Sequence, residues 1–98
     1  MKLEFASNRL AEAGFSLSVA SRQLGIPIGR KYIQRLAVLR AVDKFYQLFG
    51  LQALQFHPLK GDRIGQYAIT LTGNFRLIIE KIDEESVRIV EVEDYHGN

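Results

Sequence analysis

Side chains that can move protons or bind anions gather in two short segments of this sequence and at one arginine between them. In chain order they are His57, Lys60, Arg63, Arg76, Asp94, Tyr95 and His96. The first three lie in the segment HPLKGDR and the last three in the segment DYH. A solvated loop is the simpler interpretation of HPLKGDR taken alone, because loops are polar for reasons unrelated to function.

Together these residue types match the cleavage of RNA without a metal ion. That reaction needs a base for the 2′-hydroxyl, an acid for the 5′-oxygen and fixed cations beside the phosphorus. The sequence has no cysteine and only two histidines, so we expect neither a metal site nor another cofactor. Lys60 and Arg63 can equally form a solvated turn, and Arg76 can pair with Glu80 or Glu91 across a sheet.

The composition is that of one globular domain, residues 1–98. Of these residues 47% are hydrophobic, so we expect a single modest core. The lack of cysteine fits a reducing cytoplasm. Glutamates interrupt the apolar run that a signal peptide would need near the N-terminus, and no segment reaches the ~18 apolar residues of a membrane span. We therefore expect a cytoplasmic protein without membrane contact.

Charge is divided unevenly along the chain, although the net charge is only +2. Residues 1–49 carry eight basic and three acidic side chains, a net charge of +5. Residues 50–98 carry five basic and eight acidic side chains, a net charge of −3. A basic half favours contact with a polyanion, although a solvated arginine-rich helix gives the same balance.

The first half of the chain has helical periodicity after one short strand. KLEF alternates charged and apolar residues and predicts the strand, and Ser7 or Asn8 can cap a helix through RLAEAGFSLSVASRQ. Gly25 should end that helix, and Pro27 should begin a second helix that continues to Gly50. The second helix has apolar residues at helical spacing, which we expect in the core: Tyr32, Leu36, Leu39, Phe45, Tyr46 and Phe49.

After Gly50 the apolar period changes to two. QYAITLT and FRLIIEKI flank a turn at Gly73 and Asn74, and VRIVEVEDY follows the turn DEES, which predicts three strands in an antiparallel meander. The residues expected on the apolar face are Tyr67, Ile69, Leu71, Phe75, Leu77 and Ile79. The order strand, helix, helix, three strands predicts an α+β fold, with two helices packed on one face of a small, mainly antiparallel sheet.

Alternation along the last strand places its polar residues on both faces. Asp94 and His96 should share one face while Tyr95 points to the other, where it can be part of the core, stack on a base or donate a hydrogen bond. Arg76 lies in the neighbouring strand, and its distance from His96 depends on the register, which the sequence does not fix.

The segments HPLKGDRIGQYAITLTGNFRLIIE and VEVEDYHG resemble the HigB branch of the RelE-like bacterial toxins, also called plasmid maintenance killer proteins. The helical half agrees only in the order of its elements. The resemblance implies a RelE-like fold and the toxin of a type II toxin-antitoxin system. Such toxins are ribosome-dependent endoribonucleases that cut mRNA in the ribosomal A site and inhibit translation. An antitoxin, usually a HigA-like helix-turn-helix protein, holds them inactive.

The resemblance also implies roles for single residues. Those that match active-site positions of the branch are His57, Lys60, Asp94, Tyr95 and His96. Arg63 and Arg76 match its basic surround and are expected to contact phosphate or RNA.

In the mechanism that this implies, His96 handles protons at the scissile phosphate, and Asp94 sets its tautomer or orientation. Lys60 and Arg76 stabilise the charge on the nonbridging oxygens, and His57 supplies the complementary acid or base. Which group is acid and which is base cannot be read from the sequence, because side-chain environments decide the pKa values.

Two other functions stay open. ParE-like toxins share the small fold and bind DNA gyrase without a catalytic set, although Lys60 and the DYH segment argue against this. A plain RNA-binding sheet would show exposed stacking aromatics, whereas most aromatics here occupy apolar-face positions. Ribosome-docking residues are not identifiable beyond a set of basic candidates: Arg30, Lys31, Arg35, Arg40 and Lys44.

Overall fold

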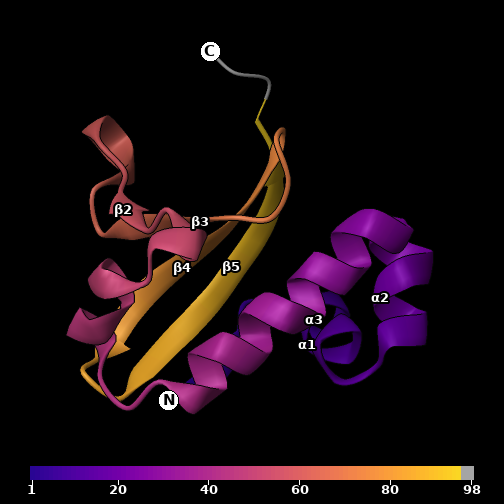
Figure 1. Cartoon of the computed structure of the whole chain (residues 1–98), viewed down its shortest axis with the longest axis horizontal. Helices are drawn as coiled ribbons and strands as arrows, with labels where there is room; N and C mark the ends of the chain where they lie inside the picture. The colour runs from indigo at the N-terminus through magenta and orange to yellow at the C-terminus, as the bar shows by residue number, and fades with distance from the viewer. Residues whose placement is uncertain (96–98) are drawn as a thin grey trace.

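The structure, a computed structural model, describes residues 1–95. Its strands are β1 (Lys2–Phe5), β2 (His57–Pro58), β3 (Gln66–Thr70), β4 (Phe75–Asp83) and β5 (Ser86–Asp94). Its α-helices are α1 (Asn8–Phe15), α2 (Leu17–Leu24) and α3 (Ile26–Ala41). Three short 3₁₀ helices follow α3: Phe45–Gly50, Gln52–Leu54 and Gly61–Arg63. Figure 1 shows the helical half beside the sheet.

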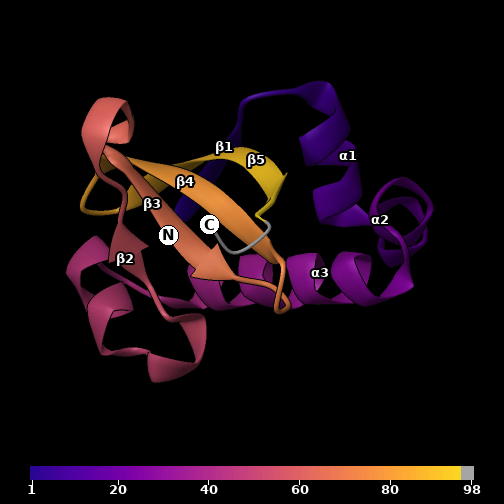
Figure 2. The same ribbon diagram turned by 90° about the horizontal axis from the view of Figure 1, so that it is seen from above.

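The strands form one five-stranded sheet in the order β1-β5-β4-β3-β2. Strands β3, β4 and β5 form the predicted antiparallel meander, while β1 pairs in parallel with β5 at the edge. The two-residue strand β2, which we did not predict, pairs with β3 at the opposite edge. Figure 2 shows α3 along one face of this sheet, with α1 and α2 near the first residues of α3. The predicted α+β class is therefore confirmed.

The helical half divides differently from the prediction. The single helix expected before Gly25 is two helices, because Ser16 adopts an extended conformation and its side chain accepts a hydrogen bond from the backbone nitrogen of Val19. Ser7 caps α1 in the same way. Gly25 separates α2 from α3 at a φ of 84°, a conformation that glycine adopts without a steric penalty. Pro27 lies in the first turn of α3, as expected.

The prediction that this last helix continues to Gly50 was wrong. Helix α3 ends at Ala41, and the chain then turns toward the β4–β5 hairpin. There the backbone nitrogen of Phe45 donates to the carbonyl oxygen of Glu84 at 2.7 Å. These long-range contacts replace helical ones, so Phe45 is buried, whereas Tyr46 and Phe49 are exposed rather than in the core.

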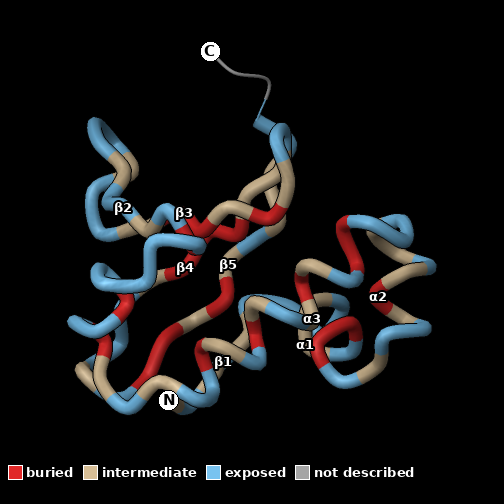
Figure 3. Tube along the Cα trace, in the orientation of Figure 1, coloured by how far each residue is buried: buried red, intermediate tan, exposed pale blue. Residues whose placement is uncertain are grey.

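The core lies between α3 and one face of the sheet, as the buried segments in Figure 3 show. Tyr32, Leu36 and Leu39 of α3 are buried against residues such as Leu77 and Ile79 of β4. Burial raises the pKa of Tyr32, whose hydroxyl donates to the carbonyl oxygen of Leu10. Within residues 1–95 the structure has no helix with the length and apolar character needed to cross a membrane.

Candidate active site

The predicted site residues lie mostly on the sheet face that points away from the helices. Because residues paired across strands share a face, the register defines this open face. Its residues are Glu4 on β1, His57 on β2, Gln66, Ala68 and Thr70 on β3, Arg76, Ile78 and Glu80 on β4, and Arg88, Glu91 and Glu93 on β5. Of these, Ala68 and Ile78 are buried. Neighbouring strands are about 4.8 Å apart and residues advance about 3.4 Å along a strand. His57 is two strands and two residues away from Arg76, so their backbones are separated by roughly 12 Å.

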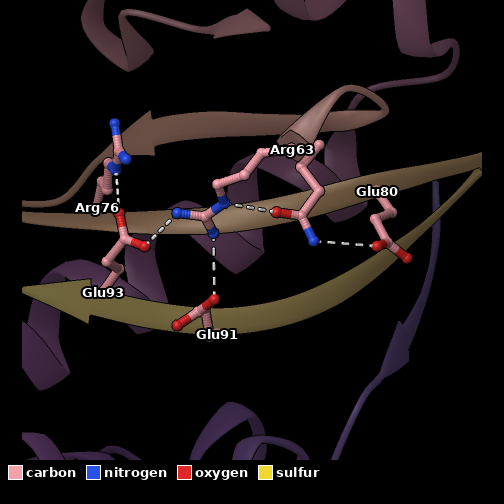
Figure 4. Close-up of polar contacts among 6 residues, drawn as sticks. Arg63, Arg76, Glu80, Glu91 and Glu93 are labelled. Atoms are coloured by element: carbon pink, nitrogen blue, oxygen red, sulfur yellow. Dashed lines mark hydrogen bonds and ion pairs between the residues drawn. The ribbon is translucent and has the colours of Figure 1, made fainter. Parts of the chain in front are cut away.

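Glu93 joins two arginines at the centre of the open face (Figure 4). Its Oε1 accepts a hydrogen bond from Nη1 of Arg63 at 2.5 Å, and its Oε2 accepts one from Nε of Arg76 at 2.6 Å. Glu91 accepts a further bond from Nη2 of Arg63 at 3.2 Å. The two cations that we expected at a phosphate are therefore already paired with carboxylates inside the protein.

The protonation of this cluster follows from its contacts. Burial alone would favour the neutral form of Glu93, but the hydrogen bonds from Arg63 and Arg76 outweigh it and hold the pKa of the carboxyl below its usual value. The hydrogen bond to Glu93 likewise raises the pKa of Arg63. Near neutral pH Glu93 is therefore a carboxylate and Arg63 a guanidinium cation.

Tyr95 covers the guanidinium of Arg76. The ring centroid lies 3.9 Å from Cζ of Arg76, a distance typical of stacking between a cation and an aromatic ring. The backbone nitrogen of Tyr95 donates to the carbonyl oxygen of Asn74, which anchors the residue beside the β3–β4 turn. Tyr95 is 39% exposed, so the alternative that it is a core residue was wrong.

His57 is exposed at the edge of the open face, with one ring nitrogen engaged. Its Nδ1 lies 2.8 Å from the backbone carbonyl oxygen of Gln55. A carbonyl oxygen can only accept, so Nδ1 carries the proton in this contact and the neutral ring has its lone pair at Nε2. Gln55 adopts a left-handed conformation at φ 49°, and its side chain accepts a bond from the hydroxyl of Thr70. His57 can therefore act as a base through Nε2.

The other predicted residues are less closely connected to this cluster. Lys60 is exposed and precedes the 3₁₀ helix Gly61–Arg63. Asp94 pairs with Phe75, which packs on the core, and therefore belongs to the face opposite to Arg76 and Tyr95. His96 lies outside the described residues. No group of three His, Cys, Asp or Glu side chains arranged to hold a metal ion occurs in the described part of the chain.

Sequence reasoning missed Glu93 and Gln66. Gln66 accepts from Nε of Arg63 at 3.0 Å and donates to Glu80 at 3.2 Å, which extends the polar cluster along β3. We also considered that Arg76 pairs with Glu80 or Glu91. Arg76 does pair with a glutamate across the sheet, but that glutamate is Glu93. Period-two alternation put Glu91 and Glu93 on one face of the last strand, but only the register identifies which glutamate lies opposite Arg76.

Three of the five basic residues that we considered for ribosome docking have contacts inside the protein. Arg35 donates to the backbone carbonyl oxygens of Thr70 and Ala53, so it ties α3 to the sheet. Arg40 stacks over the ring of Phe15, and Lys44 pairs with Glu85. The exposed Arg30 and the half-buried Lys31 stay as docking candidates.

Comparison with solved structures shows the class of protein to which this fold belongs. A YoeB/ParE toxin from Agrobacterium tumefaciens superposes with a TM-score of 0.60, covering 98% of this chain and 100% of that chain at 16% sequence identity. The YoeB dimer from Staphylococcus aureus gives a TM-score of 0.57 over 98% of this chain and 97% of that chain at 16% identity. YafQ from E. coli superposes with a TM-score of 0.55, covering 95% of this chain and 91% of that chain at 15% sequence identity. The chain therefore has the fold of the RelE/YoeB-type toxins.

Sequence comparison identifies a more specific relative. The chain is 38% identical over 60 residues to a Proteus vulgaris protein named Endoribonuclease HigB. The match covers 59% of this chain and 64% of that protein, so the chain spans less than two-thirds of the relative's length. No protein-family model matches the chain. The similarity to HigB that the sequence predicted is thus confirmed.

Proposed function

We propose that this protein is the toxin of a type II toxin-antitoxin system and a ribosome-dependent endoribonuclease that inhibits translation. One observation carries the proposal. Arg76, its guanidinium stacked under Tyr95, shares the open face with His57 in a chain similar to a HigB endoribonuclease. Cations fixed beside a proton-transfer group are what phosphodiester cleavage requires.

In the proposed reaction the 2′-oxygen attacks the adjacent phosphorus and the bond to the 5′-oxygen breaks. Nε2 of His57 is available to accept the 2′-hydroxyl proton, while the terminal nitrogens of Arg76 and the ammonium of Lys60 stabilise the nonbridging oxygens. His96 is proposed to protonate the 5′-oxygen, and Asp94, on the opposite face of β5, is given no part in this step. The products would be a 2′,3′-cyclic phosphate and a 5′-hydroxyl.

Its partners in this proposal are the ribosome, the mRNA and a helix-turn-helix antitoxin of the HigA type, all in the cytoplasm. Bending of the message in the ribosomal A site would supply the in-line geometry that the attack requires. No metal ion or other cofactor takes part in the proposed steps.

The test is cleavage of mRNA on programmed ribosomes, with fragment ends mapped and their chemistry determined. We expect a cut in the codon held in the A site, with a cyclic phosphate at the upstream end. Cutting should persist in excess chelator when polyamines keep the ribosomes intact. Loss of cutting that zinc or manganese restores would contradict the metal-free mechanism.

The same test addresses the gyrase-binding alternative, which receives no support from the comparisons. A protein that leaves ribosome-bound mRNA intact but inhibits purified DNA gyrase would reverse the proposal. Lys60→Ala should weaken mRNA cleavage by at least about tenfold, because it removes a cation from the proposed site. Arg88→Ala serves as a control, since Arg88 pairs only weakly with Glu4 and Glu80 at 3.4 Å each.

A further inference from the structure

Glu93 is the most buried carboxylate of the open face, and the proposed chemistry gives it no role. Its side chain is 19% exposed, compared with 48% for Glu91 and 35% for Glu80. Burial of a carboxylate is unfavourable unless cations and donors compensate for the lost hydration. Here each oxygen of Glu93 accepts a hydrogen bond from an arginine, and these two bonds compensate for the lost hydration.

Arg63 is fully engaged within the protein. Its Nε donates to Gln66, its Nη1 to Glu93 and its Nη2 to Glu91. These bonds connect the 3₁₀ helix Gly61–Arg63 to β3 and β5, and they hold Glu93 from one side. Because each nitrogen of the Arg63 guanidinium already has an acceptor within the protein, Arg63 stabilises the local structure and has no nitrogen left unpaired for a ligand.

Arg76 is held differently. Its Nε donates to Glu93, and the ring of Tyr95 covers one face of its guanidinium. The Arg76 side chain is 15% exposed, and within residues 1–95 neither of its terminal nitrogens has a hydrogen bond to the protein, so both can donate to an acceptor that reaches them. Figure 4 shows that end of Arg76 pointing away from Glu93. Two terminal nitrogens of one guanidinium can bind two oxygens of a phosphate.

We propose that Glu93 is a positioning residue, which fixes Arg76 through Nε so that its two terminal nitrogens face the scissile phosphate. Arg63 anchors Glu93 in turn. The inference rests on the proposed nuclease function. It assigns to Glu93 the role of orienting Arg76, the cation that would bind the phosphate. A pre-oriented cation stabilises the transition state without reorganisation during the reaction.

A carboxylate is the group that this task requires. Glutamate offers an acceptor oxygen to each arginine and a negative charge that offsets their mutual repulsion. Glutamine has the same shape but only one acceptor oxygen, and its amide nitrogen would face a guanidinium donor. In a Glu93→Gln protein one arginine must therefore lose its partner. Arg63 keeps two other acceptors, so we expect Arg76 to be the one released.

The experiment compares Glu93→Gln with Glu80→Gln, a half-buried glutamate of the same face that does not contact Arg76. On programmed ribosomes, Glu93→Gln should lower kcat by at least about tenfold and change KM less than about twofold, while Glu80→Gln stays within about twofold in both. In an Arg76→Ala background, Glu93→Gln should cause no further loss of kcat, because it acts through Arg76. A further loss there would make Glu93 a catalytic residue and overturn the positioning role.

A second readout does not depend on activity. NMR of arginine side chains should show the Nε–H of Arg76 protected from exchange with water in the parent protein and in Glu80→Gln, and unprotected in Glu93→Gln. Unchanged protection together with unchanged kcat in Glu93→Gln would overturn the proposal. If the parent protein fails to cut mRNA, the nuclease function fails, and the NMR comparison still decides whether Glu93 holds Arg76. Thermal melts of all variants report whether they are folded.

Discussion

Two guanidinium groups share one carboxylate at the centre of the candidate site, and this limits what the free protein attracts. Arg63 pairs with both Glu91 and Glu93, and Arg76 pairs with Glu93. The positive charge of the two arginines is therefore offset before any phosphate approaches. Among the described residues of the site, the terminal nitrogens of Arg76 and the exposed Lys60 can still offer positive charge to a ligand. For the proposed function we therefore expect this site to favour a precisely placed phosphate over polyanions in general.

Acid should weaken the protein through Glu93. The pKa of Glu93 is below its ordinary value of 4.5, so its contribution to stability is present above about pH 4.5 and is lost as pH falls through the lower, folded-state pKa. Melting temperatures measured from pH 7 down to pH 3 should show the parent above Glu93→Gln at neutral pH, and the two converging in acid. Glu84, whose pKa is lowered by Lys81, is present in both proteins and cancels in the comparison. A constant difference at every pH would contradict this assignment.

His96→Ala tests the proton-transfer role proposed for the DYH segment. We expect removal of the imidazole to cost less than ~1 kcal/mol of unfolding free energy, the usual range for a substitution that opens no cavity in a core. Loss of a proton-transfer group lowers the rate by about 10²- to 10⁴-fold. We therefore expect an unchanged melt and antitoxin binding, at least about a hundredfold slower mRNA cleavage and no growth arrest. Equal toxicity of His96→Ala and Arg88→Ala at matched expression would show that the histidine is dispensable.

At the scale of elements, the contact between α2 and α3 depends on Gly29. A Cβ built on Gly29 would lie 2.7 Å from the backbone carbonyl carbon of Ala20, and backbone atoms cannot move aside as a flexible side chain can. Alanine gains about 1 kcal/mol in helix propensity over glycine, but forced overpacking costs about 1–3 kcal/mol and leads us to expect net destabilisation. Gly29→Ala should lower the melting temperature by several degrees. Gly73→Ala is the control, since nothing lies within 4 Å of its Cβ position.

The strands were predictable in detail and the helices only in part. Alternation along β3 and β4 correctly identified the residues that face the helices, because side chains of a strand point alternately to its two faces. Ala68 and Ile78 on the other face are buried as well. The helical pattern between residues 8 and 50 did not reveal the break at Ser16 or the end of α3 at Ala41. Both depend on particular contacts: a side-chain cap at Ser16 and a bond from Phe45 to the β4–β5 turn. The strand β2 is two residues long, too short to give a periodic signal.

The candidate site was likewise predictable only in part. The types of residue and their placement on strands were visible in the sequence, and the structure puts His57 and Arg76 on one face. The pairing of Arg76 with Glu93 was not visible, because it depends on the β4–β5 register and on a shift between Ile78 and Ile79. The catalytic roles of His57, Lys60, Asp94, Tyr95 and His96 stay predictions.

At the scale of the whole molecule, the excess of positive charge lies in the first half of the chain and the candidate site lies in the second half. The net charge of +5 in residues 1–49 belongs to β1 and the helices, whereas the candidate site lies on the strands of the half that carries −3. Exposed Arg30 lies on α3, away from the sheet's open face. A large polyanion that contacts both parts can use the helical charge for docking and the open face for chemistry. Ribosomal RNA with a bound message is large enough to contact both the helices and the open face.

Free RNA should therefore be a poor substrate. A net charge of +2, with Arg63 and Arg76 already paired, gives few phosphate contacts and little counterion release. Without a ribosome to bend the message, the in-line geometry for 2′-oxygen attack is also rarely populated. We expect cleavage of a naked transcript at physiological salt to be at least about a hundredfold slower than cleavage of the same transcript on ribosomes, measured at equal protein concentration. The naked transcript should also bind with a shallow dependence on salt. Efficient digestion of the naked transcript at many codons would contradict ribosome dependence, while leaving the assignment of a nuclease in place.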